Sequence, residues 1–314
     1  MKGILLSVII IFLLLLAAVY IFIPQKLIIS SASSFNANRE SVYRFLINDK
    51  NWEKWWPGTV SKNSKDSFLF RYKGYDFQIE EIFHNVIQLK LVENTDSSVS
   101  LLKVIPFTND SMGVEISSGL DTRSDPFNKI SAYFRAKKIK HALDDILLSL
   151  KKYTSDLKNI YGINIKKEKV QYQNLLSTKR SFSHYPTTED IYAIIGKLRN
   201  YIDQSGGKEL FSPMLNIKKT DSTTYIAQIG IPVDKELPTK DNFTSKQMMK
   251  GGNILTGEVT GGQKQIDEAE RQLETYIRDY QRSIIAIPFQ MLITDRTKEP
   301  DSTKWITRIY YPVV

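Results

Sequence analysis

Residues 221–233 read DSTTYIAQIGIPV, and residues 301–313 read DSTKWITRIYYPV. Seven of the thirteen aligned positions are identical, and the aromatic residues Tyr225 and Trp305 correspond. Farther upstream the correspondence continues at an offset of 75 residues, in the pairs Ile191/Ile266, Leu198/Leu273, Tyr201/Tyr276, Ile202/Ile277 and Pro213/Pro288. Five extra residues in the loop at 296–300 explain the change to an offset of 80. Several matched anchors with one local insertion predict a duplicated unit, over about residues 165–235 and 244–314.

Each copy is expected to fold as strand, helix, strand, strand. The helices are predicted at residues 187–202 and 263–280, where apolar residues follow helical spacing. Thr187 or Thr188 is a suitable N-cap for the first helix, and Gly206 with Gly207 ends it. The glycine pair therefore follows its helix, whereas a phosphate-binding loop precedes one.

The tandem β-α-β-β arrangement resembles the GyrI-like small-molecule-binding domain, also called the AraC-type effector-binding domain. The residues that carry the resemblance are Gly261, Leu273, Tyr276, Trp305, Ile306, Thr307, Ile309, Pro312 and Val313. The resemblance covers about residues 161–314 and implies two pseudo-symmetric units with an aromatic-lined ligand cleft between them. In many relatives this module senses or sequesters organic molecules, frequently cationic and hydrophobic, and a few members hydrolyse them.

The sequence departs from this family pattern in its last strand. Relatives often carry a carboxylate there, at positions where this chain has Gln228 and Arg308, and Gln263 replaces a common aromatic residue. A buried carboxylate would balance a cationic ligand, because an unpaired charge removed from water costs several kcal/mol. If Arg308 faces the cleft, it favours an anionic or neutral ligand instead. No helix-turn-helix segment precedes the module, so the transcription-factor role of many relatives is not expected.

Strand alternation supplies the candidate binding residues. In the last strand the odd-numbered residues 305–311 share one face and the even-numbered residues 306–312 share the other. Only the second face offers a charge and a phenol together. We predict ligand contacts for Arg308, Tyr310, Gln228, Tyr225, Trp305, His184, Tyr185 and Glu258. For each of them a solvated or structurally bonded side chain is the alternative.

The N-terminal segment is strongly apolar. Residues 4–23, ILLSVIIIFLLLLAAVYIFI, contain no charge, and twenty helical residues span about 30 Å, the thickness of the hydrocarbon core. A cleaved signal peptide is the alternative, but its apolar region is usually shorter and ends in a small-residue cleavage site. We therefore predict a single-pass anchor over residues 1–26. Orientation is poorly determined by charge, with a slight preference for an exported C-terminal body.

The middle of the chain, residues 27–158, is predicted to contain a strand, a helix pair, five or six antiparallel strands, and a long helix opened by Asp125 and Pro126. Nine apolar residues form the predicted stripe of that helix: Phe127, Ile130, Phe134, Ile139, Leu143, Ile146, Leu147, Leu150 and Tyr153.

This order of elements resembles the polyketide-cyclase/START-like (SRPBCC) superfamily. The local residues that carry the resemblance are Asn38, Val42, Leu46, Trp52 and Trp55, followed by Trp56 and Pro57. The resemblance implies a helix-grip fold that encloses an apolar cavity for a lipid or another hydrophobic molecule. We interpret the tryptophans as packing the helix pair against the sheet, with direct ligand contact as the alternative.

Composition excludes several classes of site. The chain has no cysteine, which excludes disulfides, Cys-ligated metal and a cysteine nucleophile, and it has only three histidines. No metal, cofactor or catalytic residue is therefore predicted. The net charge of +9 is concentrated at residues 127–169, which hold eleven lysines and arginines and four acidic residues. We interpret this run as the solvated face of a helix, with contact to anionic headgroups as the alternative and nucleic acid not expected.

The sequence thus predicts an α+β protein with an N-terminal transmembrane helix, a START-like helix-grip domain and a duplicated GyrI-like domain. The expected function is non-enzymatic binding of a hydrophobic or amphiphilic small molecule at a membrane. Two alternatives remain, a hydrolase acting in the GyrI-like cleft and a tethered interaction scaffold without an open pocket. His184 and Glu258 are polar enough to activate water, but nothing in the sequence places them together.

Overall fold

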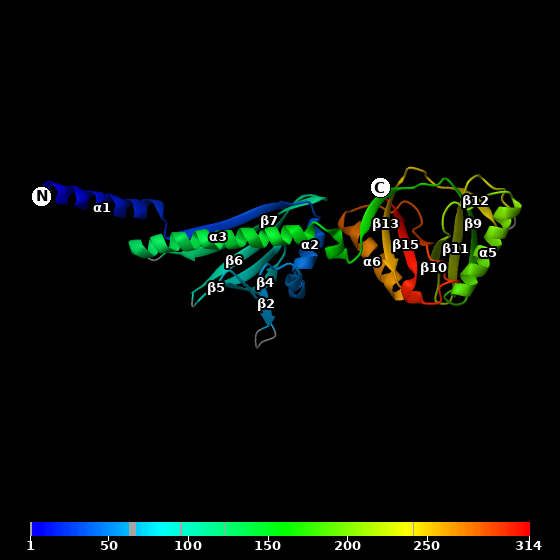
Figure 1. Ribbon diagram of the computed structural model, residues 1–314, viewed down its shortest axis with the longest axis horizontal. Coiled ribbons are helices and arrows are strands. Elements are labelled where there is room, and N and C mark those ends of the chain that lie inside the picture. The colour runs from blue at the N-terminus through cyan, green and yellow to red at the C-terminus, as the bar shows by residue number, and fades with distance from the viewer. Residues whose placement is uncertain (1, 63–66, 95, 123, 241) are drawn as a thin grey trace. The chain divides into compact units, whose positions relative to one another are not determined.

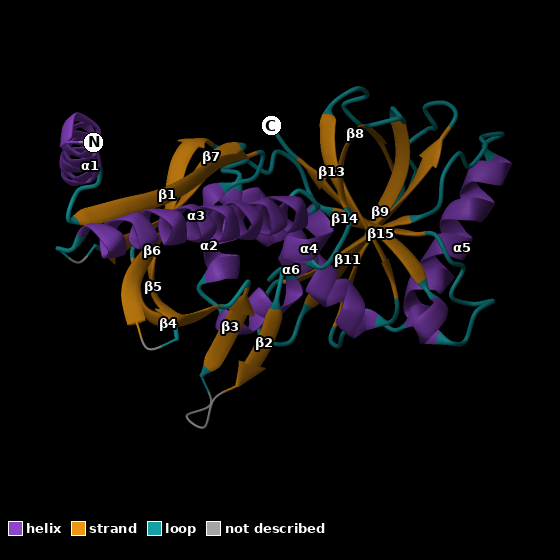
Figure 2. Cartoon of the chain, turned by 60° about the vertical axis from the view of Figure 1, so that its left-hand side comes forward, coloured by secondary structure: helices purple, strands orange, loops and turns teal. Residues whose placement is uncertain are grey.

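The computed structural model describes residues 2–62, 67–94, 96–122, 124–240 and 242–314. The chain forms two compact units, which we call unit 1 (Met1–Asp156) and unit 2 (Leu157–Val314). Each unit contains one antiparallel sheet with helices packed on it, so the architecture mixes α and β structure (Figures 1 and 2).

Unit 1 begins with helix α1 (Lys2–Phe22), and strand β1 (Lys26–Phe35) follows at once. The next elements are α2 (Arg39–Leu46), the 3-10 helix η1 (Asp49–Lys54), β2 (Thr59–Lys62), β3 (Phe68–Tyr72), β4 (Tyr75–Phe83), β5 (Val86–Glu93), β6 (Asp96–Thr108), β7 (Ser111–Asp121) and α3 (Pro126–Thr154). The seven strands pair in the order β1-β7-β6-β5-β4-β3-β2. Only β1 departs from a simple meander, because it closes the sheet beside β7.

Helix α1 contains one stretch, Ile4–Phe22, that is long and apolar enough to cross a membrane, although a signal sequence has the same properties. Most of its side chains are exposed; Ile4, Leu14 and Phe22, for example, are 74%, 65% and 80% exposed. This segment is therefore not packed like the core helix of a water-soluble protein.

Helix α3 begins where the sequence predicts. Asp125 is its N-cap and accepts hydrogen bonds from the backbone N–H groups of Phe127 and Asn128, both at 3.0 Å, while Pro126 occupies the first turn. The predicted apolar stripe is only partly correct. From Ile139 to Leu150 it is buried against the sheet, but Phe127 and Phe134 are 79% and 58% exposed. In the first turns of α3 the buried face is made by Lys129 and Ala132 instead, so the predicted apolar residues lie on another side of the helix.

The tryptophans pack the helix pair against the sheet, as expected. Trp52 is fully buried, and its indole N–H donates to the carbonyl of Leu46 at 2.8 Å. Its ring lies 4.9 Å from Trp55 and 5.1 Å from Phe70, centroid to centroid. Asn38 caps α2 by accepting a hydrogen bond from the Ser41 N–H.

Unit 2 contains the short helix α4 (Leu157–Tyr161) and two series of elements. The first half consists of β8 (Ile165–Lys169), β9 (Asn174–Phe182), α5 (Thr188–Gln204), β10 (Met214–Lys219) and β11 (Tyr225–Val233). The second half consists of β12 (Thr244–Gln247), β13 (Asn253–Thr260), α6 (Gln263–Asp279), β14 (Phe289–Leu292), the 3-10 helix η2 (Ser302–Lys304) and β15 (Ile306–Pro312). The strand order is β12-β9-β11-β10-β14-β15-β13-β8, so the first strand of each half pairs within the other half.

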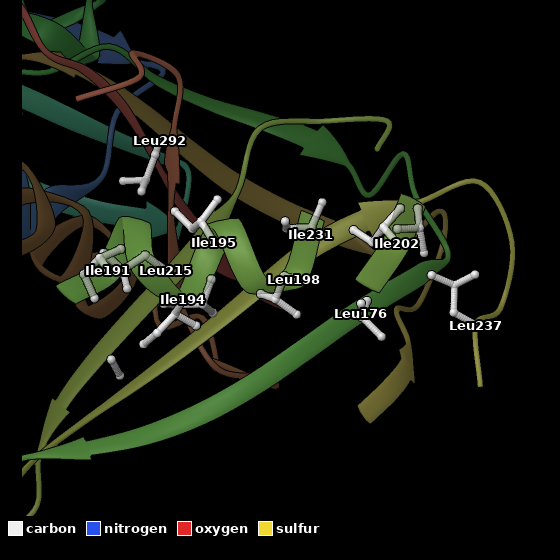
Figure 3. Packing of buried hydrophobic residues seen from close by; sticks show 13 residues of the cluster. Leu176, Ile191, Ile194, Ile195, Leu198, Ile202, Leu215, Ile231, Leu237 and Leu292 are labelled. Atoms are coloured by element: carbon white, nitrogen blue, oxygen red, sulfur yellow. The ribbon is translucent and has the colours of Figure 1, made fainter. Parts of the chain in front are cut away.

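Both long helices of unit 2 cover the same face of the sheet. Helix α5 packs through Ile195 and Leu198 onto β9, β10 and β11 (Figure 3), and α6 packs through Ile266 and Leu273 onto β13 and β15. Thr187 caps α5 in a capping box with Asp190, as expected for this sequence. The opposite face carries a third cluster: Val170, Tyr172, Leu175, Met214, Ile254, Phe289, Met291 and Tyr310.

The aromatic cluster of unit 1 gives a test of the fold. Phe70 is fully buried beside Trp52 and Trp56, so Phe70→Ala should lower the free energy of unfolding of unit 1 by about 3–5 kcal/mol through the cavity it leaves. Guanidinium denaturation of the full chain in detergent, followed by tryptophan fluorescence, measures this change. Phe83→Ala is the matched control at a half-exposed position and should cost less than about 1 kcal/mol. Equal effects of the two variants would contradict the packing described.

Candidate functional site

A cavity of about 540 Å³ lies in unit 2 where the central strands part. Strands β10 and β14 pair at only two positions, Met214 with Met291 and Leu215 with Gln290. Beyond them, residues 209–213 and 291–293 both line the cavity, which we call the Tyr310 pocket. Its other main lining residues come from β8 and the segment after it, from α5, from the loop after β14 and from β15: Glu168, Lys169, Tyr172, Tyr192, Arg199, Asp295, Arg308 and Tyr310.

Two buried phenols line this pocket. Tyr172 and Tyr310 are 6% and 7% exposed, and burial raises the pKa of both. The Tyr310 ring stacks on Phe289 at 4.9 Å, and its hydroxyl lies 3.9 Å from the Met291 sulfur. A side-chain interaction with Arg308 opposes the rise in the pKa of Tyr310. The Tyr172 hydroxyl has no hydrogen-bond partner among the described residues, so it is available to bind a polar atom of a ligand.

The charges around the pocket are balanced. Arg199 donates two hydrogen bonds to Glu209, at 2.8 and 3.0 Å, and Arg308 donates two to Glu258, at 3.2 and 2.8 Å. The Glu258 carboxylate lies opposite Arg308 in the β13–β15 register and raises the pKa of the guanidinium. Arg308 is therefore not the free cation that the sequence analysis considered, and its attraction for an anion is largely offset.

A second polar cluster occupies the helix-covered face of the sheet. The Arg296 guanidinium lies 4.6 Å from the centroid of the Trp305 ring and donates to Thr307 Oγ1 at 3.0 Å. Burial lowers the pKa of Arg296, and no carboxylate in the described part of the chain lies within ion-pair distance of it. The aromatic surface of Trp305 is thus already covered by a cation from the same chain.

Tyr185 extends this cluster from the loop before α5. Its ring contacts Tyr225 edge-on at 5.7 Å, and burial raises its pKa to about 12 although 45% of the residue is exposed. On α6, burial also raises the pKa of Glu270, which accepts a hydrogen bond from Gln290 at 2.9 Å. Burial thus raises the pKa of both groups, but Tyr185 is still partly in contact with solvent and Glu270 is hydrogen-bonded to Gln290.

The sheet separates the residues predicted to share one site. Arg308 and Tyr310 line the pocket on one side, whereas Tyr225 and Trp305 project toward the helix-covered side with Tyr185. Gln228 lies on the pocket side of β11 but is not a lining residue.

His184 and Glu258 do not form a catalytic pair. His184 Nε2 lies 3.1 Å from Asp190 Oδ2, and Glu258 binds Arg308. Each side chain therefore has a different structural partner, and this arrangement offers no His–Glu pair that could activate water.

Sequence reasoning missed Tyr172, Phe211 and Arg296. Val170 and Tyr172 are apolar positions on either side of the polar Gln171, just before β9. This alternation was the signal in the sequence that Tyr172 is buried. Phe211 contacts Tyr172 at 5.2 Å from the loop before β10, and Arg296 belongs to the inserted loop. Neither loop residue has a periodic pattern around it, so only the folded chain shows their positions.

Unit 1 has a separate pocket of about 1040 Å³ between its sheet and the first half of α3. Leu91, Leu120 and Ile139 are its apolar floor, but most of its lining is polar or charged, including Lys26, Glu80, Lys90, Glu93, Ser98, Ser118 and Arg135. The lining of this pocket is therefore more polar than the apolar cavity expected of a helix-grip fold.

Comparisons with known proteins give only distant likenesses. No family model matches the sequence, and no curated protein matches it. The crystal structure of the EcmrR C-terminal domain is similar at 13% identity and a TM-score of 0.42, over 48% of this chain and 98% of that one. The Zhui aromatase/cyclase from Streptomyces sp. R1128 is similar at 8% identity and 0.31, over 40% and 93%. A START superfamily protein from Mycobacterium smegmatis is similar at 12% identity and 0.28, over 39% and 98%. Likenesses of this degree say nothing about the ligand or activity of this chain.

The Arg308–Glu258 pair predicts how the pocket responds to charge. Glu258→Gln leaves Arg308 without its carboxylate, so the affinity for the anionic probe 8-anilinonaphthalene-1-sulfonate should rise about threefold to tenfold, as expected for one partly exposed charge. Titration calorimetry of the full chain in lipid nanodiscs, with empty nanodiscs subtracted, measures the change. Glu236→Gln removes the same charge from an exposed loop outside the pocket and should have no such effect. An unchanged affinity in Glu258→Gln would show that Arg308 does not face the bound probe.

Proposed function

We propose that this chain is a membrane-anchored, non-enzymatic protein that binds a neutral or amphiphilic aromatic molecule in the Tyr310 pocket. The observation that carries the proposal is the pair of buried phenols, Tyr172 and Tyr310, at the wall of a cavity of about 540 Å³. Ligand pockets typically enclose about 300–1,000 Å³ and combine an apolar lining with few, well-placed polar groups. Met291, Ile254 and Phe211 supply the apolar part here.

The charge distribution supports a ligand without a strong net charge. Three cationic and three acidic side chains line the pocket, and both Arg199 and Arg308 have carboxylate partners. A cationic ligand finds no unpaired buried carboxylate there, and Arg296 already covers Trp305 on the other side of the sheet. Strong binding of organic cations, which the family resemblance suggested, is therefore disfavoured in both places.

We further propose that residues 161–314 are a GyrI-like domain made of two copies, 165–235 and 244–314. Leu215 and Gln290 are counterparts at the 75-residue offset of the sequence repeat, and they pair with each other across β10 and β14. A two-fold axis through the middle of the sheet requires that the residues next to it pair with their own counterparts, as Leu215 and Gln290 do. The mutual exchange of β8 and β12 between the halves fits the same symmetry.

The N-terminal parts are assigned in the same way. Residues 1–26 are proposed to be an uncleaved membrane anchor, because α1 is apolar on all sides and exposed along its length. Residues 27–158 are proposed to be a START-like domain, since a sheet order of β1-β7-β6-β5-β4-β3-β2 with a long C-terminal helix suits a helix-grip fold. We propose an exported C-terminal body only as a slight preference, since the positive charges flanking α1 are nearly balanced.

Hydrolysis in unit 2 is less well supported. A hydrolase needs an activated nucleophile or water beside an oriented base. His184 is bonded to Asp190, and Glu258 is bonded to Arg308. A scaffold without a pocket is also disfavoured, because the Tyr310 pocket has room for a ligand.

A neutral probe tests the proposal. N-phenyl-1-naphthylamine has the aromatic body of the anionic probe without its sulfonate, and the full chain in nanodiscs should bind it more tightly than the anion. Ser212→Trp places a large ring in the pocket lining and should weaken this binding at least about tenfold, which corresponds to about 1.4 kcal/mol. Titration calorimetry with subtraction of empty nanodiscs gives both affinities.

Ser222→Trp is the matched control, because Ser222 is exposed and does not line the pocket. It should leave the affinity for the neutral probe unchanged. Binding that survives Ser212→Trp, or that is lost equally in both variants, would argue against a ligand site in the Tyr310 pocket.

A further inference from the structure

Four large apolar and aromatic side chains on the first turns of α3 are exposed to solvent. Phe127, Ile130, Tyr133 and Phe134 are 79%, 38%, 41% and 58% exposed, and we call this group the α3 ridge. Their spacing places them along one side of the helix. A patch of this kind on a water-soluble surface is unfavourable unless something covers it.

The α3 ridge lies where α1 ends. The Tyr20 hydroxyl, on the last turn of α1, donates to the carbonyl of Ser124 at 2.8 Å, and Ser124 directly precedes the N-cap of α3. Lys129, only 3% exposed, donates from Nζ to the carbonyl of Ile23 at 2.5 Å and lies 5.5 Å from the Tyr20 ring centroid. A buried ammonium on an otherwise free carbonyl at a helix end is a strong and specific tie.

This tie fixes the depth of the ridge relative to the anchor. If Ile4–Phe22 spans the hydrocarbon core, Tyr20 lies at the boundary between hydrocarbon and headgroups, where tyrosine is preferred. Ser124 is then at the same boundary, and Phe127 follows within one helical turn. Phe127 and Phe134 are about 10 Å apart along the helix axis, which matches the depth of about 5–10 Å to which amphipathic helices insert.

Basic residues follow the ridge on the exposed part of α3. Lys137, Lys138 and Lys140 are exposed, and Lys137 lies about 15 Å farther along the axis than Phe127. The Lys137 ammonium is 5.0 Å from the centroid of Tyr133, so it borders the ridge directly. Along α3, apolar residues are thus followed by lysines. This matches the boundary of a bilayer, where the hydrocarbon is followed by anionic headgroups.

We infer that the α3 ridge inserts into the boundary of the bilayer beside α1 and that Lys137 and Lys138 contact anionic headgroups. The inference rests on the proposed membrane anchoring by α1. Unit 1 is then held on the lipid surface by two elements, α1, which crosses the bilayer, and the first turns of α3, which enter its boundary, so α1 is more than a flexible tether. The polar pocket of unit 1, lined by Asn128, Ser131 and Arg135 of the same helix half, opens next to this contact.

The absence of cysteine makes the test direct. Single cysteines at Phe127 and Phe134 in the full chain can be labelled with an environment-sensitive nitrobenzoxadiazole fluorophore. The chain is reconstituted in vesicles of equal parts phosphatidylcholine and phosphatidylglycerol. Lipids brominated on the acyl chains report contact with hydrocarbon, and iodide reports contact with water. Both substitutions are at exposed positions, so the fold should be unaffected.

Two further labelled positions serve as controls. Phe12→Cys lies in the middle of α1 and tests the anchor alone. Leu148→Cys is an equally apolar, exposed position, 65% accessible, on the far half of α3, and it should be quenched by iodide and not by brominated lipid.

The labels at 127 and 134 should be quenched by brominated lipid at least about twice as strongly as the label at 148 and should be protected from iodide. If the label at 12 is embedded but those at 127 and 134 are open to iodide, the ridge inference fails and the anchor stands. If the label at 12 is also aqueous, the anchor proposal fails. Protection from iodide without quenching by brominated lipid would place a protein partner, such as a second copy, on the ridge and overturn the inference.

The lysines have their own arm of the test. Replacing phosphatidylglycerol by phosphatidylcholine should reduce the quenching of the label at 134 by brominated lipid, and Lys137→Gln with Lys138→Gln should reduce it similarly in the anionic vesicles. Quenching that is the same in every case would overturn the headgroup contact.

Discussion

Two residue pairs, Met214 with Met291 and Leu215 with Gln290, join the two halves of the eight-stranded sheet. Beyond these pairs the Leu292 N–H still donates to the Pro213 carbonyl at 2.9 Å, and residues 209–213 and 291–293 line the Tyr310 pocket. The junction is stabilised elsewhere, because β8 pairs with β13 and β12 pairs with β9, each across from its own half. The sheet therefore keeps an opening at its centre without losing its continuity at the edges.

The same sheet decides which side chains can act together. Neighbouring residues of β15 point to opposite faces, so Arg308 and Tyr310 line the pocket while Thr307 binds Arg296 on the helix-covered side. On each side the cation already has a partner from the chain, Glu258 for Arg308 and the Trp305 ring for Arg296. What remains available in the pocket is the Tyr172 hydroxyl, beside the Tyr310 ring and the apolar side chains of the lining. This chemistry favours a neutral aromatic guest over an ion of either sign.

Unit 1 depends on a different contact, the buried ammonium of Lys129 at the carbonyl end of α1. Because this bond is supported by Tyr20 and Ser124, the helix that leaves the proposed membrane is connected firmly to the domain that follows. The exposed α3 ridge acquires a physical reason from this connection, since it begins next to the end of the proposed membrane helix. The basic run that follows them, which in a water-soluble helix is simply a solvated face, then lies at the level of the headgroups.

The sequence alone predicted the features that depend on local spacing. Asp125, Asn38 and Thr187 cap the helices that their positions indicate, and in each half of unit 2 the expected helix is followed by two strands. The single strand expected before each helix is in fact two strands, β8 and β9 in the first half and β12 and β13 in the second. The sequence did not predict that Glu258 neutralises Arg308, that Tyr172 meets Tyr310 at one cavity, or that Phe127 and Phe134 are left uncovered. Residues 172 and 310 lie in segments separated by most of unit 2, and no local pattern records their distance. Helix caps and apolar periodicity are properties of a few consecutive residues. A pocket or a cross-strand ion pair exists only once strand register has brought distant segments together. That register is fixed by the packing of the whole sheet.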